Sequence, residues 1–361
     1  MPDERTDASE ISTALGMLGF ETLIVAVDAR PCELVNVSSA TWDRLTEVIS
    51  SGRHRRLADA AFANGVFFAA AADGLRGRRP VRIEWKGPQR PPGYDLLPAD
   101  LRIDHVFLVS CKYQSRLLMN AAPAHLFDRA LQIRNADPAR DWYALVAPEA
   151  YEAFYDSVRS TLGSWLPSHS DALTRQDRER IGRECARHWP SELELAYTNF
   201  SNEVARATAS RWSISLRSAR ERELLFWRML RFSDCPYFIL GTGPHESLRL
   251  RIATPWDWRQ RFRLTAFQLS AQPAGQPRVE WEASVTEIES GYERRVRGHV
   301  EVRWSHGRFC GMPEAKIYLD TPHKQVPGYF PLEEPQQPCL TRATSIVDPS
   351  PGPDGDVTAE S

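Results

Sequence analysis

The chain has 361 residues, which is enough for two or three domains at roughly 150 residues each. Hydrophobic residues make up 42% and charged residues 25% of it, which excludes a chain that is disordered throughout. The formal net charge of −2 excludes an overall polycation, so any surface that binds nucleic acid has to be a local patch.

Neither membrane insertion nor secretion is expected. No apolar run approaches the length of about 18 residues that predicts a membrane-spanning helix, and the N-terminal residues are charged. The six cysteines are widely scattered without a Cys-x-x-Cys pair, so we predict neither a disulfide framework nor a thiolate zinc site. We therefore expect a reduced, cytoplasmic protein with no membrane partner.

The first part of the chain alternates between strand and helix patterns. Hydrophobic runs, β-branched residues and breakers predict, in chain order, a strand over 22–27, a helix over 57–73, a strand over 81–86, a proline-rich loop over 88–98, a strand over 101–112, a helix over 123–134 and a strand over 141–147. This order indicates an α/β domain over residues 1–148.

The rest of the chain changes pattern twice. An arginine-rich helical segment is expected over 149–233, with helices at 149–162, after Ser170-Asp171, at 192–209 and at 215–231. A period of two then predicts an antiparallel β-rich domain over 234–332, with strands at 248–252, 261–267, 279–285 and 296–304. Residues 333–361 are rich in Pro, Asp, Ser and Gly, which is typical of a disordered tail.

Lysine is rare in this chain, which holds four lysines against 41 arginines. Two of them, Lys86 and Lys112, each end a predicted apolar strand, two residues after Glu84 and Ser110. Residues two apart on a strand share a face. If 101–112 is one strand, Asp104 lies on the face of Ser110 and Lys112, and pairing with 81–86 would gather all five side chains.

Carboxylates beside a lysine suit metal-assisted phosphodiester hydrolysis. Carboxylate oxygens hold Mg²⁺ or Mn²⁺, and the metal lowers the pKa of a bound water and neutralises charge on the phosphate. A nearby lysine can orient the attacking water and stabilise the transition state.

The run Asp104-x5-Ser110-Cys111-Lys112, followed by a predicted helix and strand, resembles the PD-(D/E)XK superfamily of restriction-endonuclease-like nucleases. The resemblance covers residues 57–147 and implies an αβββαβ core and Mg²⁺-dependent cleavage of DNA. It implies that Asp104 is a metal ligand and Lys112 the catalytic lysine. Ser110 stands where a second carboxylate is usual, and Glu84 is the candidate to supply the missing metal ligand.

Other interpretations stay open. The pattern is loose, and it also fits Asp73-x10-Glu84-Trp85-Lys86 and Glu314-Ala315-Lys316 followed by Asp320. Asp104 could instead cap a loop, and Lys112 could be a solvated strand end. The alternative function is a catalytically degenerate module of the same fold that binds nucleic acid or protein. A third possibility is an unrelated structural or regulatory protein whose β domain binds a ligand.

Basic residues point to one local surface for DNA. The segment from Arg53 to Arg90 has the strongest basic bias, and it precedes the candidate strands, so Arg78, Arg79, Arg82 and Lys86 are the expected contacts to nucleic acid. Arginines also alternate with aromatic residues in the C-terminal part, where a solvated sheet face is the favoured interpretation. The C-terminal β domain or the tail is the expected surface for a protein partner.

Overall fold

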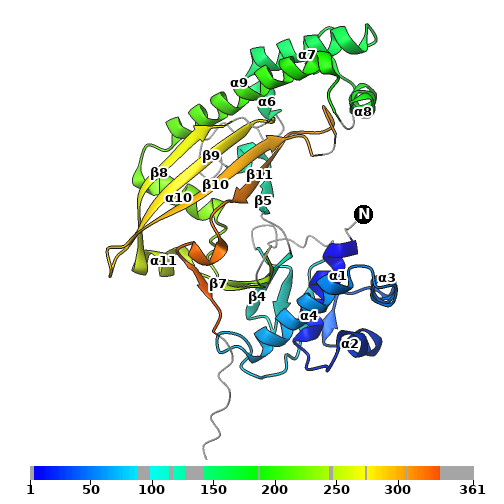
Figure 1. Ribbon diagram of the computed structural model, residues 1–361, viewed down its shortest axis with the longest axis vertical. Helices are drawn as coiled ribbons and strands as arrows, with labels where there is room; N and C mark the ends of the chain where they lie inside the picture. The colour runs from blue at the N-terminus through cyan, green and yellow to red at the C-terminus, as the bar shows by residue number, and fades with distance from the viewer. Residues whose placement is uncertain are drawn as a thin grey trace, which may run out of the picture.

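The computed structural model describes residues 4–87, 98–113, 117–126, 141–185, 188–243, 247–272, 275–305 and 307–333. Within these ranges the protein is a mixed α/β fold with two sheets (Figure 1). The N-terminal helices lie beside a seven-stranded mixed sheet, and the later helices lie beside a five-stranded antiparallel sheet. No helix of the described ranges is long and apolar enough to cross a membrane.

The seven-stranded sheet draws its strands from both ends of the chain. In spatial order it holds β1 (Leu34–Val35), β2 (Ile83–Trp85), β3 (Leu101–Ile103), β4 (Phe107–Tyr113), β6 (Tyr237–Thr242), β7 (Ser247–Ile252) and β12 (Tyr329–Pro331). Its neighbours pair antiparallel except for β1 with β2 and β4 with β6, which run parallel. A parallel pair needs a crossover connection, and here the segment between β4 and β6 supplies it.

Helices α1 (Glu4–Gly16), α2 (Leu23–Ala29), α3 (Ser39–Ser50) and α4 (Arg55–Ala70) share a hydrophobic core with this sheet. Val109 of β4 and Phe238 and Leu240 of β6 belong to that core. Helices α1 and α4 approach closely at two glycines. A Cβ on Gly16 would lie 2.1 Å from the carbonyl oxygen of Phe62, and one on Gly65 would lie 2.1 Å from that of Thr13.

The five-stranded sheet runs in the order β5 (Leu117–Ala121), β11 (Glu314–Leu319), β10 (Glu293–Arg303), β9 (Arg278–Glu287) and β8 (Phe262–Ala271). Buried valines alternate with half-buried polar residues along β9 and β10, as a half-buried antiparallel sheet requires. Its core includes residues of the later helices, which are α5 (Pro123–Leu126), α6 (Trp142–Val146), α7 (Pro148–Leu162), α8 (Arg175–Glu184), α9 (Ser191–Ser215), α10 (Ala219–Met229) and α11 (Pro255–Arg261), with 3-10 turns at Ser170–Ala172 and His323–Gln325.

Several predicted elements are confirmed. The helix predicted over 57–73 is α4, the predicted helices after residue 148 correspond to α7, α8, α9 and α10, and the period-two strands are β7 to β10. The start of the helix predicted over 123–134 is α5, while its remainder, residues 127–134, lies outside the described residues. The predicted tail also lies outside them, apart from Glu333.

Two predicted strands are helices. The run over 22–27 forms α2, because the hydroxyl of Thr22 accepts a hydrogen bond from the N–H of Val25 and Arg30 ends the helix in the left-handed region. The run over 141–147 forms α6, because the Asp141 carboxylate accepts from the N–H of Tyr143. Short apolar runs fit either element, and here capping decided for helix.

The strand predicted over 101–112 is a hairpin of β3 and β4. Asp104 and His105 have φ values of 48° and 60°, and the pairing of Ile103 with Phe107 closes a tight turn around them. Positive φ at both central residues matches the twist of antiparallel strands, and Asp tolerates that conformation better than most residues. The alternation of faces therefore does not continue from Asp104 to Ser110.

The predicted boundaries at 148 and 233 do not separate the two sheets. Strands β6, β7 and β12 lie beyond residue 233 and complete the sheet of β1 to β4, whereas β5 lies before residue 148 and joins the other sheet. Each sheet therefore depends on segments that are far apart in the chain. The helical segment lies within the connection between β4 and β6.

Candidate functional site

Ser110 and Lys112 lie in the central strand β4, beside its parallel neighbour β6. Lys112 is opposite Gly241, and a Cβ at Gly241 would lie 1.8 Å from the carbonyl oxygen of Lys112. Only glycine permits this approach. Ser110 is 2% exposed and Lys112 is half-buried, so the end of β4 is a shielded polar position in the middle of the sheet.

Asp100 meets these residues across the hairpin. Its carboxylate oxygen Oδ2 accepts a 2.6 Å hydrogen bond from the backbone N–H of Cys111 and a 3.2 Å bond from the Ser110 hydroxyl. Its backbone N–H donates to the carbonyl of Val109, and its carbonyl accepts from the N–H of Lys86. The backbone and the carboxylate of Asp100 are therefore both held against β4.

Glu10 reaches the same place from helix α1. Its side chain is buried and accepts a 2.7 Å hydrogen bond from the indole N–H of Trp85. Burial is the main cause that raises the pKa of Glu10 to about 8, and the negative charge of Asp100 adds to it, while Lys112 opposes it. The charges of Asp100 and Lys112 therefore both act on Glu10, and we call these three residues the Lys112 cluster.

A hydrogen-bond network fixes α1 against the sheet next to this cluster. The hydroxyls of Thr13 and Tyr113 lie 2.7 Å apart, and Thr13 is three residues after Glu10, on the same helix face. The Asn64 amide lies 3.5 Å from the Tyr113 hydroxyl and donates a 2.9 Å bond to the carbonyl of Gly241. The network therefore sets the position of Glu10 relative to β4 and β6.

Lys112 is the cation of the cluster. Burial lowers its pKa, the charge of Asp100 acts in the opposite direction, and Arg231 lowers it further. Burial likewise raises the pKa of the neighbouring thiol of Cys111, with Asp100 and Glu10 adding to the shift. Lys112 alternates with Cys111 along β4, so it lies on the sheet face opposite the one that α1 covers, and Asp100 is the acid that acts on it most strongly. A lysine beside a carboxylate in a shielded place can position a water or an anionic substrate.

The donor set suits a hard divalent cation. Two carboxylates, a hydroxyl and strand carbonyls are oxygen ligands, and Mg²⁺ is usually held by one or two carboxylates together with waters and substrate phosphates. Burial is the main cause that raises the pKa of Glu10, and the negative charge of Asp100 adds to it, so a cation between the two acids would favour their charged forms. Among the described residues, no group of three or more His, Cys, Asp or Glu side chains is placed to hold a metal by itself.

Two residues predicted for this site lie elsewhere in the hairpin. Asp104 is in the turn, where its carboxylate accepts from the N–H groups of Val81 and Arg82 and pairs with Arg78 at 2.5 Å. Burial opposes its ionisation, but these donors outweigh burial and lower its pKa. Asp104 therefore caps the turn, which corrects its expected position on the face of Ser110 and Lys112.

Glu84 is held by arginines. It pairs with Arg102 and with Arg82, and the hydrogen bond from Arg102 is the largest cause that lowers its pKa. The register places Glu84 opposite Arg102 and Arg102 opposite Leu108, so Glu84 shares a sheet face with Ser110 and Lys112 as predicted. Among the carboxylates that raise the pKa of Lys112, Asp100 has the largest effect, and Glu10 contributes as well.

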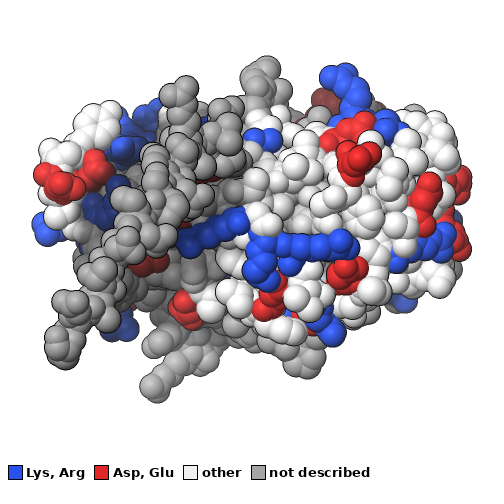
Figure 2. Space-filling view, turned by 90° about the horizontal axis from the view of Figure 1, so that it is seen from below, with Lys and Arg blue, Asp and Glu red and all other residues white. Residues whose placement is uncertain are grey.

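The predicted basic surface is largely neutralised. Arg78 pairs with Asp104, Arg79 with Glu33 and Arg82 with Glu84. Lys86 is half-buried next to the candidate site, since its N–H donates to the carbonyl of Asp100. On the face drawn in Figure 2, positive and negative side chains are interspersed over the described residues.

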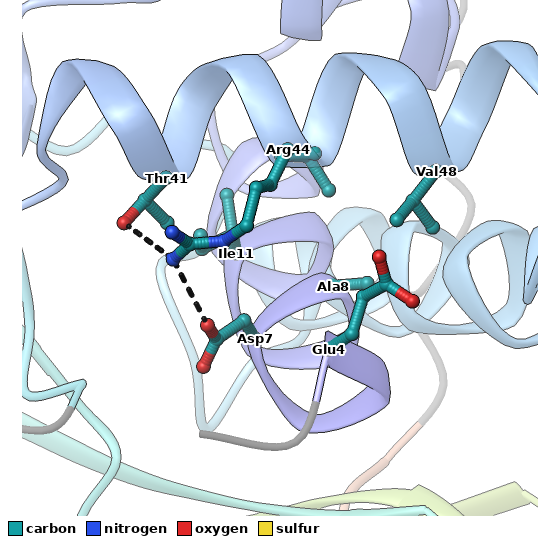
Figure 3. A pocket seen from close by; sticks show the side chains of 8 residues that line it. Glu4, Asp7, Ala8, Ile11, Thr41, Arg44 and Val48 are labelled. Atoms are coloured by element: carbon teal, nitrogen blue, oxygen red, sulfur yellow. Dashed lines mark hydrogen bonds and ion pairs between the residues drawn. The ribbon is translucent and has the colours of Figure 1, made fainter. Parts of the chain in front are cut away.

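A small hollow between α1 and α3 does not belong to the cluster. Arg44 donates to the hydroxyl of Thr41 and lies 3.8 Å from Asp7, as Figure 3 shows. The cavity has a volume of about 10 Å³, which is about the space of one water molecule. It offers no room for a substrate.

The rival lysine patterns do not assemble a comparable cluster. Asp73 is exposed in the turn after α4, and Glu314 accepts a hydrogen bond from Asn120. Asp320 pairs with His299 at 2.8 Å.

Sequence reasoning missed Glu10 and Asp100. Asp100 had a local signal, since Pro98-Ala99-Asp100 stands directly before the strand and nine residues separate Asp100 from Ser110. Glu10 had none, because its role depends on how α1 packs. Comparisons of the chain with protein-family models, with curated proteins and with solved structures find no match.

Proposed function

We propose that this protein is a metal-dependent nuclease that hydrolyses phosphodiester bonds of DNA, with its active site at Glu10, Asp100 and Lys112. The observation that carries the proposal is Asp100, whose carboxylate is held by the Ser110 hydroxyl and the Cys111 N–H next to the half-buried Lys112 at the end of β4. The buried Glu10 of α1 is the second acid, since its charge and that of Asp100 act on each other.

The resemblance to the PD-(D/E)XK superfamily supports the same assignment with a different first acid. Asp100 replaces Asp104, so that the pattern becomes Asp100-x9-Ser110-Cys111-Lys112. The hairpin β3–β4 and the parallel strand β6 would form the restriction-endonuclease-like core, with the helical segment as an unusually long connection. Glu10 takes the place for which Glu84 was the candidate.

The chemistry follows from the atoms of the cluster. Glu10 and Asp100 would hold Mg²⁺ or Mn²⁺, which supplies a water of lowered pKa and neutralises charge on the phosphate. The ammonium group of Lys112 donates hydrogen bonds to the attacking water and to the non-bridging phosphate oxygens. The Ser110 hydroxyl and the N–H of Cys111 hold Oδ2 of Asp100 in place.

Ser110 in the place of a second acid motivates the alternative function. Its hydroxyl carries no charge and binds Asp100, so the cluster has one carboxylate fewer than the usual pattern unless Glu10 compensates. A site without that compensation would bind nucleic acid, or a partner protein, without cleaving it.

Cleavage of plasmid and linear DNA by the purified chain tests the proposal. With Mg²⁺ or Mn²⁺ we expect nicking that EDTA abolishes and that Lys112→Ala, Asp100→Asn and Glu10→Gln each reduce by about a hundredfold or more, as for loss of a group that acts on the transition state. Asp104→Asn is the matched control, because this acid of the same hairpin caps a turn and is expected to keep most activity.

The pattern among the variants identifies the site. If Asp104→Asn lost as much cleavage activity as Lys112→Ala while Asp100→Asn kept full activity, the assignment of Asp100 as the first acid would be contradicted. DNA binding without cleavage by the unmodified chain would favour the binding module. If the chain neither bound nor cleaved DNA, both the nuclease and the nucleic-acid-binding function would be contradicted.

A further inference from the structure

A second polar site lies at strand ends of the five-stranded sheet. A hollow with a volume of about 530 Å³ is bordered by the start of α9, the connection between β8 and β9, the end of β10 and the strand β11. Sites for small molecules typically have volumes of roughly 300–1,000 Å³. The hollow therefore has room for a ligand of nucleotide size.

Cations dominate its lining. Arg303, Arg308 and Lys316 border the hollow, and Glu194 is the one carboxylate among the described lining residues. Lys316 is half-buried on β11 and stands opposite Glu301 of β10 in the strand register. Glu301 itself pairs with Arg303 at 3.4 Å. Three cations against one carboxylate in the described lining favour an anion as the ligand.

Buried donors beside the hollow lack acceptors. Within the described ranges, the indole nitrogen of Trp304, the hydroxyl of Ser305 and the Nη1 atom of Arg308 are buried without a hydrogen-bond partner. Buried polar groups in proteins are nearly always paired, because an unmade bond is unfavourable. Three such donors beside one cavity make its surroundings rich in N–H and O–H groups, which suits a ligand with several acceptor atoms.

Aromatic rings stand next to these donors. The Arg308 guanidinium lies 4.0 Å above the ring of Trp189, and the Trp189 and Tyr197 rings are 5.1 Å apart. Guanidinium groups bind phosphate through paired N–H donors, and aromatic and guanidinium planes stack on nucleobases. Sugar phosphates and inorganic phosphate have no base that could contact Trp189 and Tyr197.

We propose that this hollow binds a nucleoside phosphate. Arg303, Arg308 and Lys316 would bind its phosphate groups, Trp189 and Tyr197 would contact its base, and Glu194 would accept a hydrogen bond from the ribose or from an exocyclic amine. This site is independent of the Lys112 cluster, since the two are built on different sheets. It also gives a role to Lys316, one of the four lysines of the chain.

Calorimetric titration of the full chain tests this site. The probes are the four ribonucleoside 5′-triphosphates, the four 5′-monophosphates, ribose 5-phosphate and inorganic phosphate. We expect at least one nucleotide to bind more tightly than about 1 mM, and ribose 5-phosphate and phosphate to bind at least tenfold more weakly. Arg308→Ala and Lys316→Met should each weaken the nucleotide by about tenfold or more, as for loss of a charge-assisted hydrogen bond.

Two control variants test whether the effect belongs to this site. Arg175→Ala removes an exposed cation of α8 and should bind as the unmodified chain does, and so should Lys112→Ala. Lys316→Met keeps the length of a half-buried side chain, so it separates lost binding from lost folding. The proposal is overturned if no nucleotide binds, if Arg308→Ala and Lys316→Met bind normally, or if Lys112→Ala abolishes binding. Phosphate that binds as tightly as the nucleotides would overturn the contact with the base.

Discussion

Glu10 is a buried carboxyl group whose ionisation disfavours the folded state. Its pKa of about 8 lies far above the ordinary value of 4.5, mainly because burial disfavours the charged form. The folded chain therefore binds one proton more than the unfolded chain between these two values. Stability from this group is fully present below pH 4.5 and is lost as the pH rises through 8.

We expect the free energy of unfolding of the unmodified chain to fall by about 2–3 kcal/mol between pH 6 and 8 relative to Glu10→Gln, at about 1.4 kcal/mol per pH unit. Glutamine carries no titratable proton and keeps an acceptor for Trp85. Urea unfolding in EDTA at several pH values measures the difference. Glu21→Gln changes an exposed residue, and its free energy of unfolding should vary with pH as that of the unmodified chain does. If the free energy of Glu10→Gln also varied with pH in parallel with the unmodified chain, the prediction would be contradicted.

At the scale of elements, the crossing of α1 and α4 determines where Glu10 lies. Gly16 and Gly65 allow backbone contact between the helices, with no space for a Cβ at either position. The side chains of Thr13 and Asn64 then link both helices to Tyr113 of β4. Small changes in this crossing should move Glu10 relative to Asp100 and Lys112.

Gly65→Ala tests this crossing. Alanine normally stabilises a helix by about 1 kcal/mol over glycine, but here its Cβ would meet the Thr13 carbonyl at 2.1 Å. We expect a net loss of about 1–3 kcal/mol in urea unfolding, as for an overpacked core, together with a weaker pH dependence as water reaches Glu10.

Ala63→Gly is the matched control, because this position of α4 is exposed. Its free energy of unfolding should fall by about 1 kcal/mol, from helix propensity alone, and should depend on pH as that of the unmodified chain does. A Gly65→Ala variant more stable than the unmodified chain would mean that the two helices can move apart at little cost.

At the scale of the whole molecule, each of the two sheets is built from strands that are far apart in the sequence. Strand β4 pairs with β6 from Val109 opposite Phe238 to Tyr113 opposite Thr242, although the helical segment separates them in sequence. Phe238 and Leu240 of β6 complete the core under the N-terminal helices. The site at the end of β4 therefore exists only when both ends of the chain have folded together.

A fragment of residues 1–148 is accordingly expected not to fold by itself. It would lack β6, β7 and β12 and leave β4 as an unpaired edge beside an incomplete core. Circular dichroism and limited proteolysis should show no cooperative unfolding and no protected core. The matched control ends at residue 333, keeps every described element and should unfold like the full chain. A cooperative transition in the short fragment would contradict this interpretation.

The sequence by itself determined the features that depend on neighbours along the chain. The alternation over β8 to β10, the helices after residue 148, and Ser110-x-Lys112 at the end of a strand all follow from local periodicity and composition. Local patterns suffice there because the side-chain period of a strand or helix is set by backbone geometry.

Only the tertiary structure decided which acids meet Lys112. The turn at Asp104 and His105 reverses the chain, so Asp104 lies at the far end of the hairpin and Asp100 comes opposite Ser110. Glu10 comes from a helix about a hundred residues away, placed by the contact of Gly16 with α4. Turn conformation and helix packing depend on the whole core, whose energy no short stretch of sequence contains.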